Sequence, residues 1–219
     1  MKLRSLSRPL ALAALLAVSG PSMAALVGLN SLSAFNAAVL VSGTDNFDSL
    51  APTGSPLTRS AGSFSYTATA DTQGFFNAGA GTDVWLTPDE SSDSITFSAF
   101  VGGVNSIGGL FFGSDIAGSF LGGQTLMLEA TDFEGSMAMT LFNTTTTTFF
   151  GFVSNGALSS LRVSIQQPAT TTAWATVNNL VLAAATAASG PPAPPTLPEP
   201  ASLALVALGL AGLGLRRRA

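Results

Sequence analysis

Short runs in which apolar and polar residues alternate fill most of the chain from Gly62 onward. In GSFSYTATA, Phe64, Tyr66 and Ala68 fall on one face and Ser and Thr on the other, which is typical of a half-buried strand. Similar runs are SITFSAF, QTLMLEA, SMAMTLFN, TTFFGFV, LSSLRVSI and WATVNNLVLA, separated by turn-forming clusters such as GGVN, FGSD, LGGQ, FEGS and SNGA. Strands at this spacing, without intervening helices, predict an all-β domain at residues 25–185, an antiparallel β-sandwich or jelly roll.

One stretch ahead of these runs has helical spacing instead. Within LNSLSAFNAAVLV, from Leu29 to Val41, the apolar residues Leu32, Phe35 and Val39 recur at helical intervals, and Ser31 or Ser33 can cap the N-terminus. A helix of about two turns is not stable alone. We therefore expect a short N-terminal helix that packs on the β domain.

The first 24 residues have the three parts of a secretory signal peptide. Residues 10–18 form a short apolar core, small residues precede Ala25, and the positively charged start contains Lys2, Arg4 and Arg8. We expect export and cleavage between Ala24 and Ala25. The alternative is a buried N-terminal helix, which the flanking charges and the small-x-small ending disfavour.

The other end of the chain has a second apolar segment. Residues 201–215 form an uninterrupted apolar run of 15 residues, followed by the cluster Arg216, Arg217 and Arg218. As a transmembrane helix this run would be about 22 Å long against a hydrocarbon layer of roughly 30 Å, so it suits a transient stop during export, with the arginines on the cytoplasmic side. Residues 186–197 are rich in proline and predict a stiff, extended linker.

Pro198, Glu199 and Pro200, followed by the apolar run and the arginines, resemble the PEP-CTERM sorting signal, here residues 198–219. The resemblance implies a Gram-negative host that makes exopolysaccharide, and recognition by an exosortase-type membrane protease that cleaves at or near the motif. An ordinary C-terminal anchor is the alternative, and the signal peptide at the other end favours sorting. We expect passage from the export machinery through the inner membrane to the cell surface or extracellular matrix.

The body is also similar to the β-rich modules that often precede this signal. The similarity lies in the helix followed by TDNFDSL, in FFGFVSNGALSSLRVSI and in WATVNNLVL, where Asn178 and Asn179 stand in place of a common Asp-Asn pair. These modules have no general assigned activity, so this resemblance implies a fold and no reaction.

Composition removes several classes of function. The chain has no His and no Cys, which excludes disulfides, zinc sites built on these residues, and catalysis by imidazole. Between Ala25 and Pro198 there are two basic residues, Arg59 and Arg162, against 11 acidic ones, a net charge of −9. Such a body would repel phosphate backbones, so we expect no nucleic-acid partner.

Candidate binding residues are few. Trp85, Trp174 and Tyr66 offer flat rings on which a sugar can stack, and Trp85 is the best candidate for exposure because it lies beside turn residues. The alternative, which the usual place of aromatic residues in a sandwich favours, is packing in the core or at an edge. Thr144–Thr148 predict a polar hairpin, and their hydroxyls are also potential glycan acceptors.

Asp89, Glu90 and Asp93 gather three carboxylates within five residues, a ligand type that calcium prefers. A second acidic pair is Asp45 and Asp48. The stretch lacks the ligand spacing and the glycine of an EF-hand loop, and a solvated turn is the alternative interpretation.

These patterns predict a structural or interaction protein of the cell surface or matrix rather than an enzyme, without a required cofactor. The alternatives are a carbohydrate-binding module for exopolysaccharide, assisted by calcium, and a glycan-active enzyme with a carboxylate pair drawn from the acidic residues.

Overall fold

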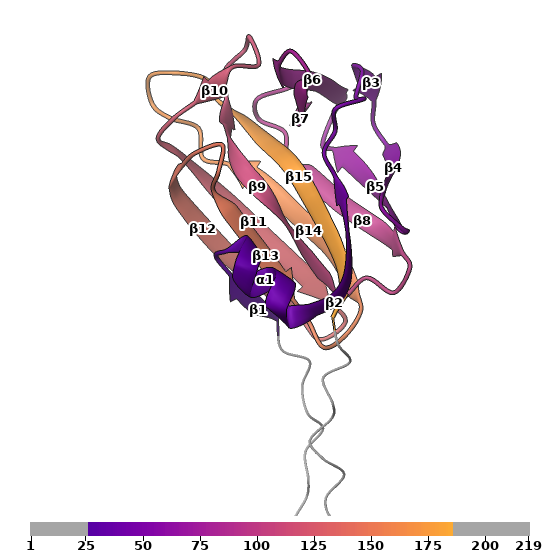
Figure 1. The fold of residues 1–219 in the computed structure, drawn as a ribbon. Helices are drawn as coiled ribbons and strands as arrows, with labels where there is room; N and C mark the ends of the chain where they lie inside the picture. Colours follow the sequence, from indigo (N-terminus) through magenta and orange to yellow (C-terminus); the bar gives the residue numbers. More distant parts are fainter. Residues whose placement is uncertain (1–25, 186–219) are drawn as a thin grey trace, which may run out of the picture.

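Alternating side chains on neighbouring strands build two antiparallel sheets, which pack face to face in the computed structural model (Figure 1). The structure describes residues 26–185. The predicted signal peptide, Pro-rich linker and sorting signal lie outside these residues, as do the residues assigned to them. No helix of the described part is long and apolar enough to cross a membrane.

The larger sheet has nine strands. The order across it is β1-β13-β9-β15-β7-β6-β3, with β10 paired to β9 and β2 paired to β15. The bounds are β1 Val27–Leu29, β2 Val39–Asp45, β3 Thr53–Gly54, β6 Gly74–Ala80, β7 Asp83–Pro88, β9 Ser106–Ser114, β10 Phe120–Leu121, β13 Phe149–Val153 and β15 Trp174–Ala185.

The smaller sheet has six strands in the order β12-β11-β14-β8-β5-β4. Their bounds are β4 Leu57–Ala61, β5 Phe64–Ala70, β8 Ile95–Val101, β11 Gln124–Asp132, β12 Ser136–Thr144 and β14 Leu158–Ile165. Phe64, Tyr66 and Ala68 of β5 are buried between the sheets, on the face that their alternation predicts. The prediction of an all-β, antiparallel domain with one short helix is confirmed.

The helix is shorter than its sequence pattern. Helix α1 covers Leu32–Ala38, and Ser31 caps it, its Oγ accepting a hydrogen bond from the Ala34 amide at 3.2 Å. Leu29 belongs to β1 and Val39 begins β2. The predicted helical end was wrong because the β-branched run that starts at Val39 pairs with β15 in antiparallel register instead of continuing the helix.

The centre of the larger sheet was not predicted. Strand β9, SIGGLFFGS, lies between β13 and β15, and its FGSD end was assigned to a turn. Its glycines allow close packing, since a Cβ at Gly108 would lie 2.8 Å from the Phe149 ring and 3.0 Å from the Phe150 carbonyl oxygen. Strands β6 and β7 were also absent from the predicted set.

Both ends of the described chain leave the sandwich at the same end (Figure 1). Val27 pairs with Val153, Val153 with Ser106, and Ser106 with Ala183, so the first and last strands share one cross-strand row. Three strand spacings separate them by about 14 Å.

Strand β15 changes neighbours halfway along. On one side it pairs with β9 throughout, while on the other Val177 pairs with Leu86 of β7 and Leu180 pairs with Asp45 of β2. Between these pairs lies a bulge at Asn178 and Asn179, and Asn179 has a positive φ of 48°. The bulge turns side chains of β15 toward the outer face of the larger sheet.

Candidate functional site

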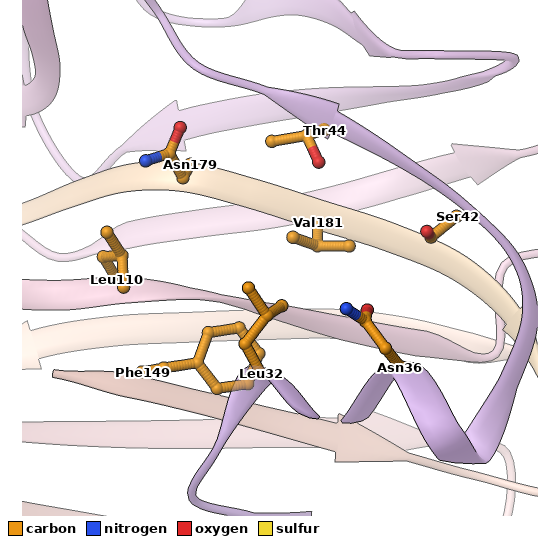
Figure 2. Close-up of a pocket in the computed structure, with 8 residues that line it drawn as sticks. All are labelled: Leu32, Asn36, Ser42, Thr44, Leu110, Phe149, Asn179 and Val181. Atoms are coloured by element: carbon orange, nitrogen blue, oxygen red, sulfur yellow. The ribbon is translucent and has the colours of Figure 1, made fainter. Parts of the chain in front are cut away.

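A groove opens on the outer face of the larger sheet, between α1 and β2 (Figure 2). Its volume is about 260 Å³. Its lining combines an apolar set, Leu32, Leu110, Phe149 and Val181, with a polar set, Asn36, Ser42, Thr44 and Asn179. We refer to it as the α1–β2 groove.

The apolar floor comes from strand alternation. In β13, Phe150 and Phe152 face the main core, so Phe149 and Gly151 face outward. Phe35 of α1 packs edge-on against Phe149, with ring centroids 5.7 Å apart, and the space above Gly151 receives the Phe35 ring. This seating of Phe35 holds α1 over the sheet and leaves the groove beside it.

The polar side of the groove has unused hydrogen-bonding capacity. Within residues 26–185, the side chains of Asn36, Ser42, Thr44 and Asn179 form no hydrogen bond to the protein. Ser42 and Thr44 alternate along β2 on the same face, next to Asn179 and Val181 of β15 (Figure 2).

The bulge fixes the position of Asn179. The Asn178 amide group donates to an Asp83 oxygen at 3.0 Å, and the Asn178 side-chain oxygen accepts from the Asn179 backbone amide at 2.7 Å. Because Asn178 is held in this way, Asn179 keeps a left-handed backbone conformation that non-glycine residues rarely adopt. Such conformations concentrate at functional sites.

The groove is chemically neutral. None of its eight lining residues is titratable. It has the layout of a small binding site, an apolar surface with a few convergent polar groups.

The three predicted aromatic residues are not brought together at a surface. Trp85 is 8% exposed and stands edge-on to Phe112, with centroids 4.8 Å apart. Trp174 is equally buried and donates its indole N–H to the Asp89 carbonyl at 3.2 Å, while Tyr66 lies in the core. Trp85 is packed rather than exposed, in agreement with the alternative of core packing, because β6 and β7 form a strand pair whose outer face carries its own small apolar cluster.

The predicted acidic loop forms hydrogen bonds within the protein. Asp93 is buried and accepts from the amide and hydroxyl of Thr72, at 2.9 and 2.8 Å, and Glu90 accepts from Gln73. Asp89 continues from β7 into the loop and donates its amide to the Gly74 carbonyl. In the part of the chain that the structure describes, no three acidic residues come together as a metal-binding group.

Asp45 joins the two sheets. Its carboxylate accepts two hydrogen bonds from Arg59 of β4, at 2.6 and 2.7 Å, and one from the Tyr66 hydroxyl of β5 at 2.7 Å. The hydrogen bond to Asp45 raises the pKa of Arg59, although burial opposes it. Burial and the adjacent Asp45 raise the pKa of Tyr66 far above its usual value, so the phenol stays neutral. Asp48 instead accepts from the Asn46 side chain.

The threonine run forms the connection between β12 and β13. Thr148 donates its amide to the Thr145 carbonyl at 2.9 Å, and the Thr145 and Thr148 hydroxyls lie 3.1 Å apart. The run is thus a polar turn, as its sequence predicts.

The residues of the groove were missed by reasoning from sequence, except that Asn178 and Asn179 were noted as a substituted pair. Asn36 lay in a predicted helix and Ser42 and Thr44 outside any predicted element. Their one signal is the alternation of SGT after Val41, which indicates a strand face with hydroxyls.

A family model for the PEP-CTERM protein-sorting motif matches residues 196–218. No curated protein and no solved structure matches the chain. The matched residues include the Pro-Glu-Pro sequence at 198–200, the apolar run and the arginine cluster, all outside the described part. The motif implies export with membrane-associated sorting, and processing by exosortase-type machinery. The chain therefore carries a PEP-CTERM protein-sorting motif at residues 196–218.

Proposed function

We propose that this protein is a structural or interaction protein of the cell surface or extracellular matrix, displayed there after its tail is processed. The sorting motif supports the route. The observation that carries the display is that β1 begins and β15 ends at the same end of the sandwich, in one cross-strand row. The opposite end, with β6, β7 and β10, therefore points away from the end at which the tail is attached (Figure 1).

In this proposal the chain is the substrate of the sorting machinery and performs no catalysis. Pro198, Glu199 and Pro200 form the recognition signal, and Arg216, Arg217 and Arg218 hold the tail at the cytoplasmic side until processing. No cofactor takes part, and calcium has no assigned role.

The test is the intact mass of the protein recovered outside the producing cells. We expect a mass that lacks residues 1–24 and everything after the Pro-Glu-Pro region. Replacing Pro198, Glu199 and Pro200 with alanine should retain the chain in the cell envelope. The matched control changes Pro191, Pro192 and Pro194 of the linker, which should leave sorting intact. Recovery of an extracellular protein that keeps residues 201–215 would overturn the proposal.

The α1–β2 groove favours a second candidate function, the binding of a neutral carbohydrate. A sugar ring has an apolar face and a rim of hydroxyls, which matches a floor of Leu110, Phe149 and Val181 beside unpaired amides and hydroxyls. The groove is smaller than the roughly 300–1,000 Å³ of pockets for drug-sized ligands, so it suits one sugar unit of a chain.

Titration calorimetry with neutral polysaccharides tests this second function. We expect the affinity to fall at least about tenfold in Asn179→Ala or Thr44→Ala. Each variant removes a polar contact to a sugar that has already lost water by packing on the apolar floor of the groove. Thr58→Ala, an exposed change on β4 of the other sheet, is the control. Heat signals that are absent, or equal in all three variants, would remove the groove from the function.

A further inference from the structure

The strands with a free side differ sharply in length. At the edges of the larger sheet, β1 has three residues and β3 has two, while in the smaller sheet β4 has five and contains Arg59. Strand β2 ends at the charged Asp45, and at Gly43 it packs closely against the backbone of Ala61 and Gly62. Short, charged or covered edges are how proteins prevent strand pairing with other chains.

Strand β12 has none of these protections. It has nine residues, SMAMTLFNT, without charge and without proline, and within residues 26–185 it pairs with β11 alone. Its outward positions include Ala138, Thr140 and Phe142, and the Phe142 side chain is 71% exposed. The strand therefore presents a long row of unpaired backbone N–H and C=O groups.

The sandwich is also open beside this edge. The core-facing Met137, Met139 and Leu141 of β12 are only half-buried. Met139 and Leu141 line a groove of about 580 Å³ that runs along β1 and the start of β13, with Leu29 and Phe150 on its other side. A further strand beside β12 would cover these apolar side chains and gain ladder hydrogen bonds together.

We propose that β12 pairs with the β12 of a second copy of this chain, antiparallel and about a two-fold axis. Two such edges are complementary because, in an antiparallel arrangement about a two-fold axis, the N–H groups of one strand face the C=O groups of the other. The pairing would join the smaller sheets of two copies into one continuous sheet. This inference goes beyond the proposed function and does not depend on how the tail is processed.

Charge and composition favour a second copy over the other occupants. The region from Ala25 to Pro198 carries a net charge of −9, which opposes association, and β12 is an edge at which two copies can meet without placing charged residues of the two strands opposite each other. The residues after the sandwich, SGPPAPPTLPEP, contain six prolines, which lack the N–H that a paired strand requires. The closed two-fold arrangement predicts a dimer rather than a fibre, because the other free edges are short, charged or covered.

The absence of cysteine from the chain allows a direct test. Single cysteines at Ala138, Thr140 and Phe142 are introduced into the full-length chain in producing cells, and oxidised samples are run on non-reducing gels. Directly opposed residues of antiparallel strands have Cα atoms about 4.5–5.5 Å apart, within reach of a disulfide. We expect covalent dimers at the position nearest the axis and few from Thr58→Cys on β4. Equal or no crosslinking at all four positions would overturn the proposal.

A second measurement disrupts pairing at β12 instead of crosslinking it. Ala138→Lys with Thr140→Lys places two exposed charges on β12, whereas Thr58→Lys charges the opposite edge of the same sheet. In sedimentation of the purified full-length chain we expect the apparent mass to halve in the β12 variant and to stay unchanged in the β4 variant. A wild-type monomer at all concentrations, or a dimer that survives the β12 charges, would contradict strand pairing; the latter outcome would point to association through the tail.

Discussion

At the scale of single residues, Asp45 links the two sheets through its side chain. It ends β2 in the larger sheet and is hydrogen-bonded to Arg59 and Tyr66 of the smaller one, while its Oδ1 also accepts the Phe47 amide at 3.0 Å. Arg59 in turn stacks over the Phe47 ring at 5.3 Å. The sequence offered Asp45 as a ligand or catalytic carboxylate, because nothing local reveals that Arg59 and Tyr66 lie beside it.

Asp45→Asn should lower the free energy of unfolding by about 3 kcal/mol, since it leaves the Arg59 charge partly buried without its partner. Asp71→Asn is the matched control, because the Arg162–Asp71 pair is exposed, with side-chain exposures of 52% and 42%. The control should cost less than about 1 kcal/mol. Urea unfolding measures both, and equal losses would contradict the assigned role.

Asp132 gives the fold a dependence on acid pH. Burial would raise its pKa, but the Ser154 hydroxyl at 2.7 Å and the amides of Glu134 and Gly135 outweigh burial and lower the pKa below the usual value. The unfolded chain therefore binds this proton more tightly than the folded one. The contribution to stability is complete above the unfolded pKa of about 3.9 and is lost as the pH falls through the folded value.

Unfolding in urea at a series of pH values from about 6 to 2 measures this contribution. Wild type should lose more stability than Asp132→Asn over the acid part of the series, because the variant has no proton to bind at this position. Asp48→Asn, which changes an exposed carboxylate, should follow wild type. Parallel curves for wild type and Asp132→Asn would refute the linkage.

At the scale of elements, alternating runs predicted the strands with one wet face, together with β13 and β15, whereas β9, which is buried on both faces, was missed. Strands β5, β8, β11 and β14 alternate because their outer face meets water. Strand β9 is covered on one side by the smaller sheet, and on the other its Phe112 packs against Trp85 of β7, so eight of its nine residues are buried. The sequence of such a strand does not alternate between apolar and polar residues. Its glycines therefore indicate a turn, unless the neighbouring strands that pack against them are known.

The seating of α1 depends on a missing side chain. A Cβ at Gly151 would overlap the Phe35 ring, so Gly151→Ala should cost about 1–3 kcal/mol as the helix is pushed off the sheet. Gly54→Ala in β3 is the control, because no atom lies within 4 Å of the place that its methyl group would take, and it should be neutral or slightly stabilising. Thermal unfolding compares the two, and equal melting temperatures would contradict the packing of Phe35.

At the scale of the whole molecule, the fold class and the sorting motif could be predicted from the sequence, whereas the α1–β2 groove could not. Alternating runs define an all-β domain, and the C-terminal sorting motif is contiguous in sequence. The α1–β2 groove instead collects residues from four separate segments, around Leu32, Leu110, Phe149 and Asn179, which meet only after the larger sheet has formed. The bulge at which β15 passes from β7 to β2 likewise depends on which strands become its neighbours in the folded sheet.

The placement of the two arginines of the body has a consequence for survival outside the cell. A trypsin-like protease cuts after Lys or Arg, and between Ala25 and Pro198 only Arg59 and Arg162 qualify. Both lie inside strands, Arg59 bound to Asp45 and Arg162 to Asp71 and Ser94, whereas such proteases favour exposed loop tips. Limited digestion should leave the native body whole, while digestion in denaturant should release three fragments. The body would then resist secreted proteases of this kind because it has few cleavage sites and because both lie within the sheets.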